Sequence, residues 1–274
     1  MGGVKVFLRL VGKLLYELRI ALILAWLMLG VFFTLGTYLY VTFGDTSIEA
    51  LSRLSPDLVS GVFGGLFAGV EPLEAWLLTL FVHPLVITLL TVATIAVAAR
   101  SLAGEIERGT LDLLLAWPVP RPALVLAAAA TIQLVLVLMV ATLWAAMHLG
   151  FVIGEIEPPA RLARFVWVAV NLWALYAAIA GVSLWFSATG FEQAKSMGRA
   201  ISFIVLSFFV NLLASLWRKV EAIDVVSVFH YYQPQPVVVE GRDPILHLVV
   251  LLAVAAVGHA LALTAFVRRD VAAA

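Results

Sequence analysis

The sequence contains no cysteine, and this absence excludes three kinds of chemistry. No disulfide can form, no thiolate can hold a metal ion, and no cysteine can act as a nucleophile. Charged residues are also scarce, at 12% of the chain, whereas roughly a quarter is usual in a soluble protein. With 64% hydrophobic residues and a mean hydropathy of +1.09, the chain is not a water-soluble domain.

Groups that carry chemistry are missing from the apolar stretches, whose only ionisable residues are histidines. An intramembrane protease or an ion-coupled carrier needs ionisable groups at depth, so the energy for any transport is expected to come from elsewhere. The histidines lack a ligand spacing such as H-E-x-x-H. GEIERGT, residues 104–110, has the glycine spacing of a phosphate loop but not its lysine. We therefore expect no catalytic residue, no metal site, no directly bound cofactor and no nucleic-acid partner.

Long charge-free windows are what the chain has in abundance. There are six, from 18 to 33 residues long, and about 20 apolar residues cross a bilayer as a helix. The windows are continuously apolar, unlike the alternating strands of a membrane barrel. We expect an all-α polytopic membrane protein, a single domain over residues 1–274. Its six spans are predicted at about 20–43, 75–99, 122–148, 165–187, 200–217 and 244–267.

An amphipathic helix is predicted before the first span, over residues 4–18. Lys5, Arg9 and Lys13 recur every four residues opposite an apolar face, which is typical of a helix lying in the membrane interface. A cleavable signal peptide is the alternative, but the apolar run that follows is too long for one.

The distribution of cations predicts the orientation. With six spans and both termini on one side, that side holds eleven of the 17 Lys and Arg residues, so it is the cytoplasmic side. The eleven are Lys5, Arg9, Lys13, Arg19, Arg100, Arg108, Arg121, Lys195, Arg199, Arg268 and Arg269.

The central stretch RSLAGEIERGTLDLLLAWPVPRP, Arg100 to Pro122, concentrates charges of both signs between the second and third spans. We expect one amphipathic helix over residues 101–117, with Gly104 as a hinge at its start. Glu105, Arg108 and Asp112 then share one face at spacings that allow ion pairs. The prolines that follow end the helix. A helix of this kind at a membrane surface predicts a docking element.

This stretch closely resembles a signature of type-2 ABC transporter permeases, E-x-E-R-G-T-L-E-L-L-L-x-x-P-V-S-R, with Asp112 and Pro120 as departures. FHYYQ, residues 229–233, and FVRRD, residues 266–270, also resemble that family. The resemblance implies a non-catalytic permease in the cell membrane, paired with a second permease copy and with separate ATPase subunits that bind ATP and Mg. The stretch would be the cytoplasmic coupling helix that docks on the ATPase.

Residue roles follow from the resemblance. Glu105, Glu107, Arg108 and Asp112 would contact the ATPase or brace the helix, and Gly109 would permit close backbone approach. Arg121 completes the expected coupling set.

Polar residues within the spans either form hydrogen bonds between helices or line a translocation path. The resemblance implies that the second and fifth spans face this path between two protomers. Its candidate residues are His83, Asn171 and Asn211. Apolar and aromatic spans favour export of a drug, lipid or hydrophobic peptide. The alternatives are a permease of the same fold serving copper-site maturation or ion efflux, a polytopic membrane enzyme, and an ATP-independent carrier.

Overall fold

The computed structural model describes residues 3–43, 70–116 and 119–269, and every element in these ranges is helical. Six helical stretches are long and apolar enough to cross a membrane: Val4–Phe43, Pro72–Ser101, Arg121–Gly154, Arg164–Thr189, Gln193–Leu216 and Ile245–Arg268. Each contains most of one predicted span, so the predicted six-span all-α fold is confirmed.

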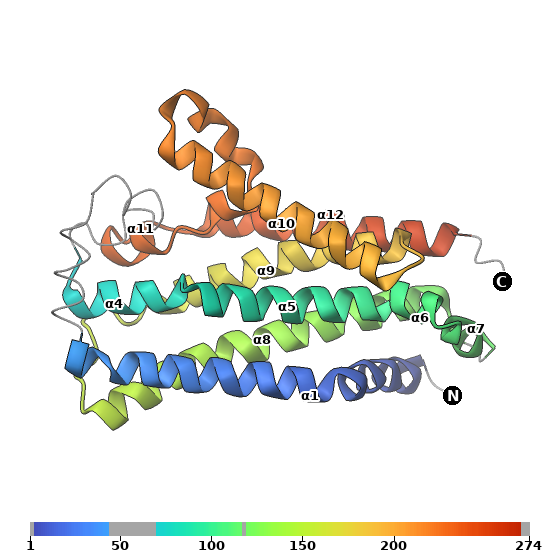
Figure 1. Cartoon of the computed structure of the whole chain (residues 1–274), viewed down its shortest axis with the longest axis horizontal. Coiled ribbons are helices and arrows are strands. Elements are labelled where there is room, and N and C mark those ends of the chain that lie inside the picture. The colour runs from blue at the N-terminus through green and yellow to red at the C-terminus, as the bar shows by residue number, and fades with distance from the viewer. Residues whose placement is uncertain (1–2, 44–69, 117–118, 270–274) are drawn as a thin grey trace.

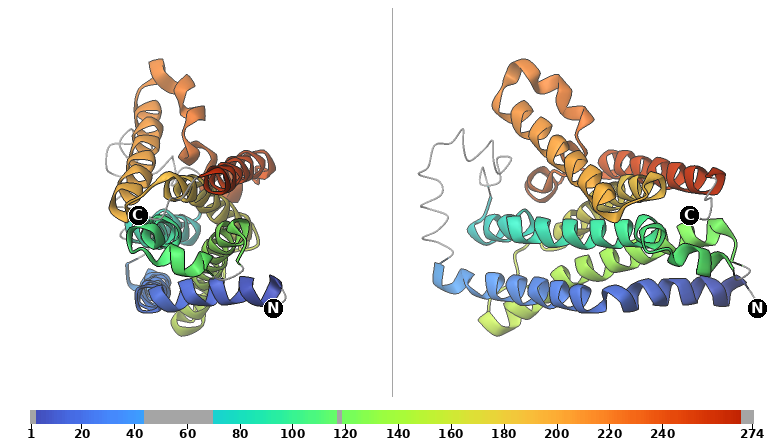
Figure 2. Two further views of the ribbon diagram at one scale, coloured as in Figure 1. Left: turned by 90° about the vertical axis from the view of Figure 1, so that its right-hand side faces the viewer. Right: turned by 45° about the vertical axis from the view of Figure 1, so that its right-hand side comes forward.

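The first span differs from the prediction in its continuity. The interfacial helix and the first span form a single helix, α1 (Gly3–Tyr38), with no break between them. The two parts nevertheless differ in direction. In Figure 2 the N-terminal part of α1 lies across the end of the bundle, whereas the rest of the helix runs along it. The predicted amphipathic helix over 4–18 is therefore present as the first part of α1, because the hydrogen-bonding ladder bends instead of ending.

The second span is divided into two helices, α4 (Pro72–Phe81) and α5 (Pro84–Ser101). Pro84 lacks an N–H and its ring disfavours a continuous helix at this point. Two short helices follow, α6 (Ala103–Glu107) and α7 (Thr110–Leu115), and then the long α8 (Arg121–Gly154). Residues 44–69, between the first and second predicted spans, lie outside the described part of the chain.

The remaining helices are α9 (Arg164–Thr189), α10 (Gln193–Leu216) and α12 (Ile245–Arg268). Between α10 and α12 lie two 3₁₀ helices, η1 (Arg218–Val226) and η2 (Val228–Tyr231), and the short α11 (Pro234–Val239). Residues 193–199, which lie before the predicted start of the fifth span, form the first turns of α10.

Helix α9 is the centre of the bundle, in contact with α5, α8, α10 and α12 (Figure 1). It packs most closely on α12 at two glycines. A Cβ added at Gly181 would lie 2.6 Å from the carbonyl oxygen of Ala255, and one added at Gly258 would overlap the backbone of Gly181. Small residues of this kind let membrane helices approach closely and gain van der Waals contact, which replaces the hydrophobic driving force of water.

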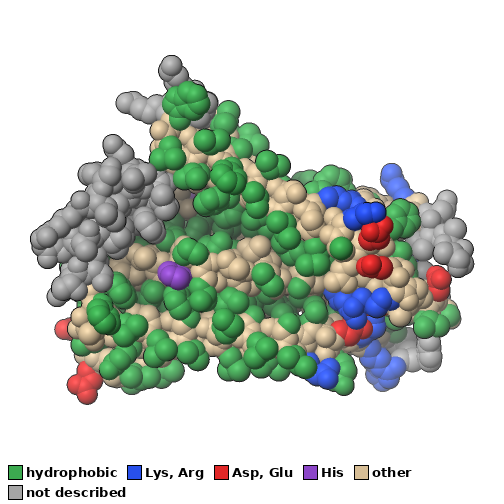
Figure 3. Space-filling model, viewed as in Figure 1, with side chains coloured by type: hydrophobic (Ala, Val, Ile, Leu, Met, Phe, Trp, Pro, Cys, Tyr) green, Lys and Arg blue, Asp and Glu red, His purple; other side chains and the backbone are tan. Residues whose placement is uncertain are grey.

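Helix α10 diverges from the bundle and carries η1 with it, whereas the other spans run roughly side by side (Figure 1). Both described ends of the chain, α6, α7 and the turn from α9 to α10 lie at one end of the bundle. The same end gathers most of the charged side chains visible in Figure 3. This end is where the predicted coupling residues must be sought.

Candidate ATPase-coupling site

The predicted coupling helix is not one helix. The chain turns after α5, forms α6, and turns again at Gly109 before α7. Gly109 has a φ of 65°, a left-handed conformation that glycine adopts without steric penalty. We refer to residues 103–116 as the elbow. The expectation of a single helix over 101–117 is wrong, because the left-handed turn at Gly109 separates α6 from α7. Glu105 and Arg108 still pair within one turn.

The two glycines of the elbow differ in their surroundings. A Cβ at Gly109 would meet nothing within 4 Å in this chain, so within the elbow the glycine serves the left-handed conformation. A Cβ at Gly104 would lie 2.7 Å from the Gln193 side chain, so Gly104 is a tight contact with the start of α10 and not a hinge.

Glu105 is the best-connected residue of the elbow and is almost fully buried, at 2% exposure. Its carboxylate accepts hydrogen bonds from Lys13 at 2.7 Å, from Arg108 at 2.8 Å and from the Thr110 hydroxyl at 2.8 Å. A buried carboxylate is stable when it is paired and hydrogen-bonded in this way. Glu105 therefore braces the elbow from inside and is not available to a partner protein.

A second carboxylate extends the cluster to α1 and α5. Glu17 lies 3.2 Å from Lys13 and 2.9 Å from Arg100, and Arg108 approaches it at 4.0 Å. The five side chains join the N-terminal helix, the end of the second span and α6 into one unit, which we call the charge clasp: Lys13, Glu17, Arg100, Glu105 and Arg108. Lys13, Glu17 and Arg100 were missed as site residues; the only sequence signal was an acid four residues after Lys13.

Glu107 connects the elbow to the next inner turn. Although it is exposed, its carboxylate accepts the backbone N–H of Gln193 at 2.8 Å. Gln193 is the first residue of α10, and an anion there satisfies one of the free N–H groups and the positive end of the helix dipole. The predicted ATPase contact at Glu107 is thus also an internal link.

Arg121, a member of the expected coupling set, contacts the end of α12 within this chain. It donates to the backbone oxygen of Arg269 at 2.6 Å. Arg269 in turn donates to the carbonyl oxygens of Ala188 and Gly190 at the end of α9, at 3.0 and 2.9 Å, and its guanidinium lies over the ring of Phe191. These contacts tie the start of α8 and the end of α12 to the turn after α9, and they show what the second arginine of FVRRD, Arg269, does.

What remains exposed on the elbow is a small surface of mixed character. Asp112 and Leu113 are exposed on α7, the latter at 68%, beside Glu107 and the partly exposed Arg108. An apolar side chain flanked by charges and held on a braced support suits protein docking. Of the two carboxylates, Asp112 therefore lies at the surface and Glu105 braces the elbow from inside.

The three candidate path residues are not brought together. His83 caps α5 and its ring lies 4.6 Å from that of Phe32, while Asn171 is buried on α9 and its amide nitrogen has no hydrogen-bond partner. Asn211 is half-buried on α10. Among the described contacts none joins two of the three, so no polar path is formed by them within one chain.

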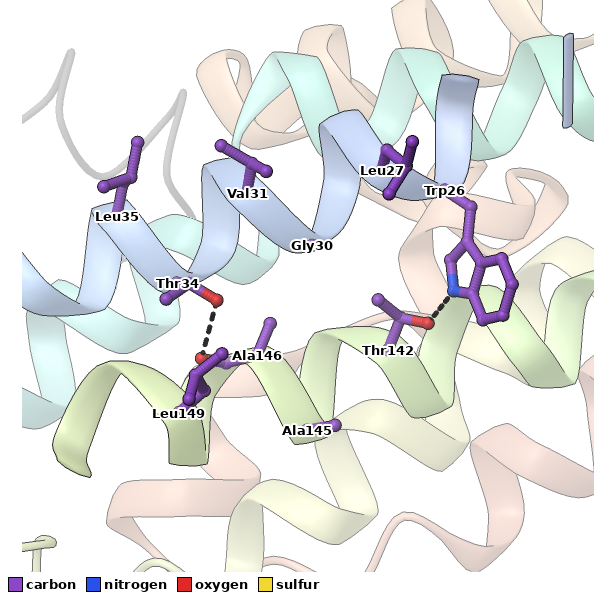
Figure 4. Close-up of a pocket in the computed structure, with 10 residues that line it drawn as sticks. All are labelled: Trp26, Leu27, Gly30, Val31, Thr34, Leu35, Thr142, Ala145, Ala146 and Leu149. Carbon is purple, nitrogen blue, oxygen red and sulfur yellow. Dashed lines mark hydrogen bonds between the residues drawn. The ribbon is translucent and has the colours of Figure 1, made fainter. Parts of the chain in front are cut away.

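An apolar groove lies between α1 and α8 on the outside of the bundle (Figure 4). It has a volume of about 640 Å³. Its polar side chains are already engaged, since Trp26 donates to Thr142 and Thr34 donates to the carbonyl of Ala146 at 3.2 Å. The groove therefore offers only apolar contact, which suits the acyl chains of a bilayer.

Taken together, six apolar helices and a braced, charged elbow at one end define a multi-pass membrane protein. A family model described as ABC-2 family transporter protein matches residues 77–271, which is most of the chain. The chain therefore belongs to the ABC-2 transporter family and is a membrane permease component of an ABC transporter. Members of this family are generally non-catalytic and associate with an ABC ATPase subunit. No curated protein matches the chain.

Proposed function

We propose that this chain is the transmembrane subunit of an exporter-type ABC transporter and that the elbow is its docking site on the ATPase. The observation that carries the proposal is the construction of the elbow. Its carboxylate Glu105 is locked from inside by three donors, while Asp112 and Leu113 are presented outward. A rigid support with an exposed tip can transmit displacement instead of absorbing it.

The orientation supports this function. The elbow, both described chain ends and the α9–α10 turn share one end of the bundle, and most of the cations belong to that end (Figures 1 and 3). By the positive-inside rule this is the cytoplasmic end, in the cell membrane. An ATPase that binds ATP and Mg in the cytoplasm would reach the elbow there.

The cargo and the assembly are part of the same proposal. A second permease copy would complete the transporter, with α5 and α10 facing the path between the two. Helix α10 supports this arrangement because it diverges from its own bundle and exposes apolar residues such as Phe208 and Phe209. Its apolar character favours a hydrophobic or amphipathic cargo, namely a drug, lipid or peptide.

The test is co-purification of the ATPase with a variant that changes only the exposed tip, Asp112→Lys with Leu113→Asp. We expect this double variant to lose the ATPase and its stimulation, because charge and shape at the contact are both altered. The matched control is Glu240→Lys with Val225→Asp, two exposed residues of the segment between α10 and α12, which we call the outer segment. If the tip variant retains the ATPase as well as the control does, the docking assignment is wrong.

A further inference from the structure

The break in the second span is built from side chains of other elements as well as from Pro84. Helix α4 ends at Phe81, and His83 is extended, with φ −61° and ψ 135°. The N–H of Leu85 donates to the imidazole Nδ1 of His83 at 3.2 Å instead of to a backbone carbonyl. The break is thus a stable local structure in which the freed backbone groups find new partners.

Two tyrosine hydroxyls reach the backbone on either side of this break. Tyr232, which follows η2, donates to the carbonyl oxygen of Phe81 at 3.4 Å, and Tyr176 on α9 donates to that of Ile87 at 2.7 Å. The Tyr176 hydroxyl also lies 3.2 Å from that of Thr91. Burial raises the pKa of Tyr232 above its ordinary value, so its hydroxyl keeps the proton that it donates.

The outer piece, α4, is fastened to the outer end of the molecule. Glu74 is fully buried and lies 2.9 Å from Arg161, which precedes α9. The indole of Trp76 donates to the carbonyl oxygen of Gly36 on α1 at 2.7 Å. A Cβ at Gly36 would lie 2.8 Å from Leu80, so α1 and α4 pack closely as well.

The inner piece, α5, is fastened to the elbow. Arg100 belongs to the charge clasp, and the N–H of Ala103, just after α5, donates to the Ser187 hydroxyl at 3.0 Å. The two pieces of one span therefore belong to different ends of the protein, and residues 82–83 are the only covalent link between them.

We propose that the second span is a jointed lever, in which α4 and α5 move as two rigid pieces. Displacement of the elbow moves α5 relative to α4, and the backbone at Val82–His83 changes conformation to allow it. The hydroxyls of Tyr176 and Tyr232 hold this joint in the conformation described above. The source of the displacement rests on the proposed ATPase coupling. The joint and its two tyrosine contacts rest on the geometry of this chain alone. Motions of this kind are absorbed by a few residues at element ends.

The first experiment needs no ATPase and uses the absence of native cysteine. Spin labels at Glu71→Cys and Val92→Cys, both exposed, report the distance across the joint in nanodiscs. Labels at Leu126→Cys and Leu149→Cys report on the unbroken α8 as a control. We expect Tyr176→Phe with Tyr232→Phe to broaden or shift the first distance and leave the second unchanged. Tyr231→Phe, which removes a hydroxyl bonded to Val225 in the outer segment, should change neither.

An unchanged distance across the joint in the double phenylalanine variant overturns the proposal. An equal change in the α8 pair also overturns it, since the hydroxyls would then support the bundle in general. The second experiment compares the co-purified ATPase complex without nucleotide and trapped with ATP and vanadate. We expect the Glu71–Val92 distance to shift on trapping and the α8 distance to stay fixed.

The two failures are distinguishable. If the trapped complex has stopped hydrolysing ATP and the distance across the joint has not shifted, the lever proposal is wrong. The proposed function is not affected by that result. Absence of any associated ATPase counts against the proposed function, and the tyrosine variants then still decide whether the joint exists.

Discussion

Glu105 illustrates how burial distinguishes two roles that the sequence leaves open. It is expected either to contact the ATPase or to brace the helix, and it is enclosed and receives three donors. Removing one partner of a buried, hydrogen-bonded charge leaves the remaining group imperfectly paired. The contribution of this residue to function is therefore indirect, through the shape of the elbow.

The Lys13–Glu105 contact gives the first prediction. Lys13→Met should lower the free energy of unfolding by about 1–3 kcal/mol, because Glu105 loses one of its donors. Lys5→Met is the control, since Lys5 is exposed on the same helix and is no member of the clasp. Thermal unfolding in detergent measures both. A double-mutant cycle with Glu105→Gln that shows no coupling energy would contradict the contact.

Gly109 gives a second prediction at this scale. Its φ of 65° strains any residue with a Cβ, so Gly109→Ala should destabilise the elbow by about 1 kcal/mol. Gly109→Asn should be milder, because asparagine tolerates the left-handed region better than alanine does. The space around a new Cβ is open at this position, so steric overlap cannot produce this order. Equal effects of the two substitutions on ATPase association and thermal stability would refute the conformational role.

At the scale of the elements, the contact of α9 with α12 is set by backbone proximity. Gly258 and Gly181 leave no room for a side chain between the helices. The stabilising term is dispersion across a close contact, which requires small residues on both sides.

Gly258→Ala should therefore lower the free energy of unfolding by about 1–3 kcal/mol through overpacking. Gly198→Ala is the matched control. Gly198 also lies in a spanning helix, and a Cβ added there would meet nothing within 4 Å. Alanine is also the better helix former, so the control should be neutral or slightly stabilising. Thermal unfolding in the same detergent measures both variants. Comparable losses of stability at the two sites would argue against the close contact.

For the whole molecule, the separation of charge along the bundle axis is the organising feature. Most of the charged side chains visible in Figure 3 lie at one end of the bundle. The clasp includes residues of α6, which lies at that end (Figure 1), as does the end of α12, where Arg121 contacts Arg269. The Glu74–Arg161 pair joins α4 to the segment before α9 at the other end. Charges are excluded from the apolar middle because their transfer into a bilayer is unfavourable. The two ends therefore meet different aqueous compartments.

Orientation gives the fourth prediction. Ala116→Cys on the elbow and Glu240→Cys in the outer segment each introduce the sole thiol of the chain at an exposed position. In intact cells a membrane-impermeant maleimide should label Glu240→Cys and spare Ala116→Cys until the membrane is opened. The reverse pattern would place the elbow outside the cell and invalidate the ATPase assignment.

Hydropathy alone located the six spans, because a bilayer demands about 20 apolar residues per helix whatever their neighbours are. The same local rules placed a charged, proline-ended element after the second span. Local patterns also made Asp112 a surface residue of that element, and the structure agrees.

Only the tertiary structure decided which side chains meet. Lys13 reaches Glu105 from another helix, Glu107 reaches Gln193, and Tyr176 and Tyr232 reach the broken span. Such contacts depend on how each helix is rotated and tilted against its neighbours, which a single sequence does not encode in any local period. For the same reason, the local sequence pattern does not predict that the elbow consists of two short helices that turn at Gly109 and are braced by α1.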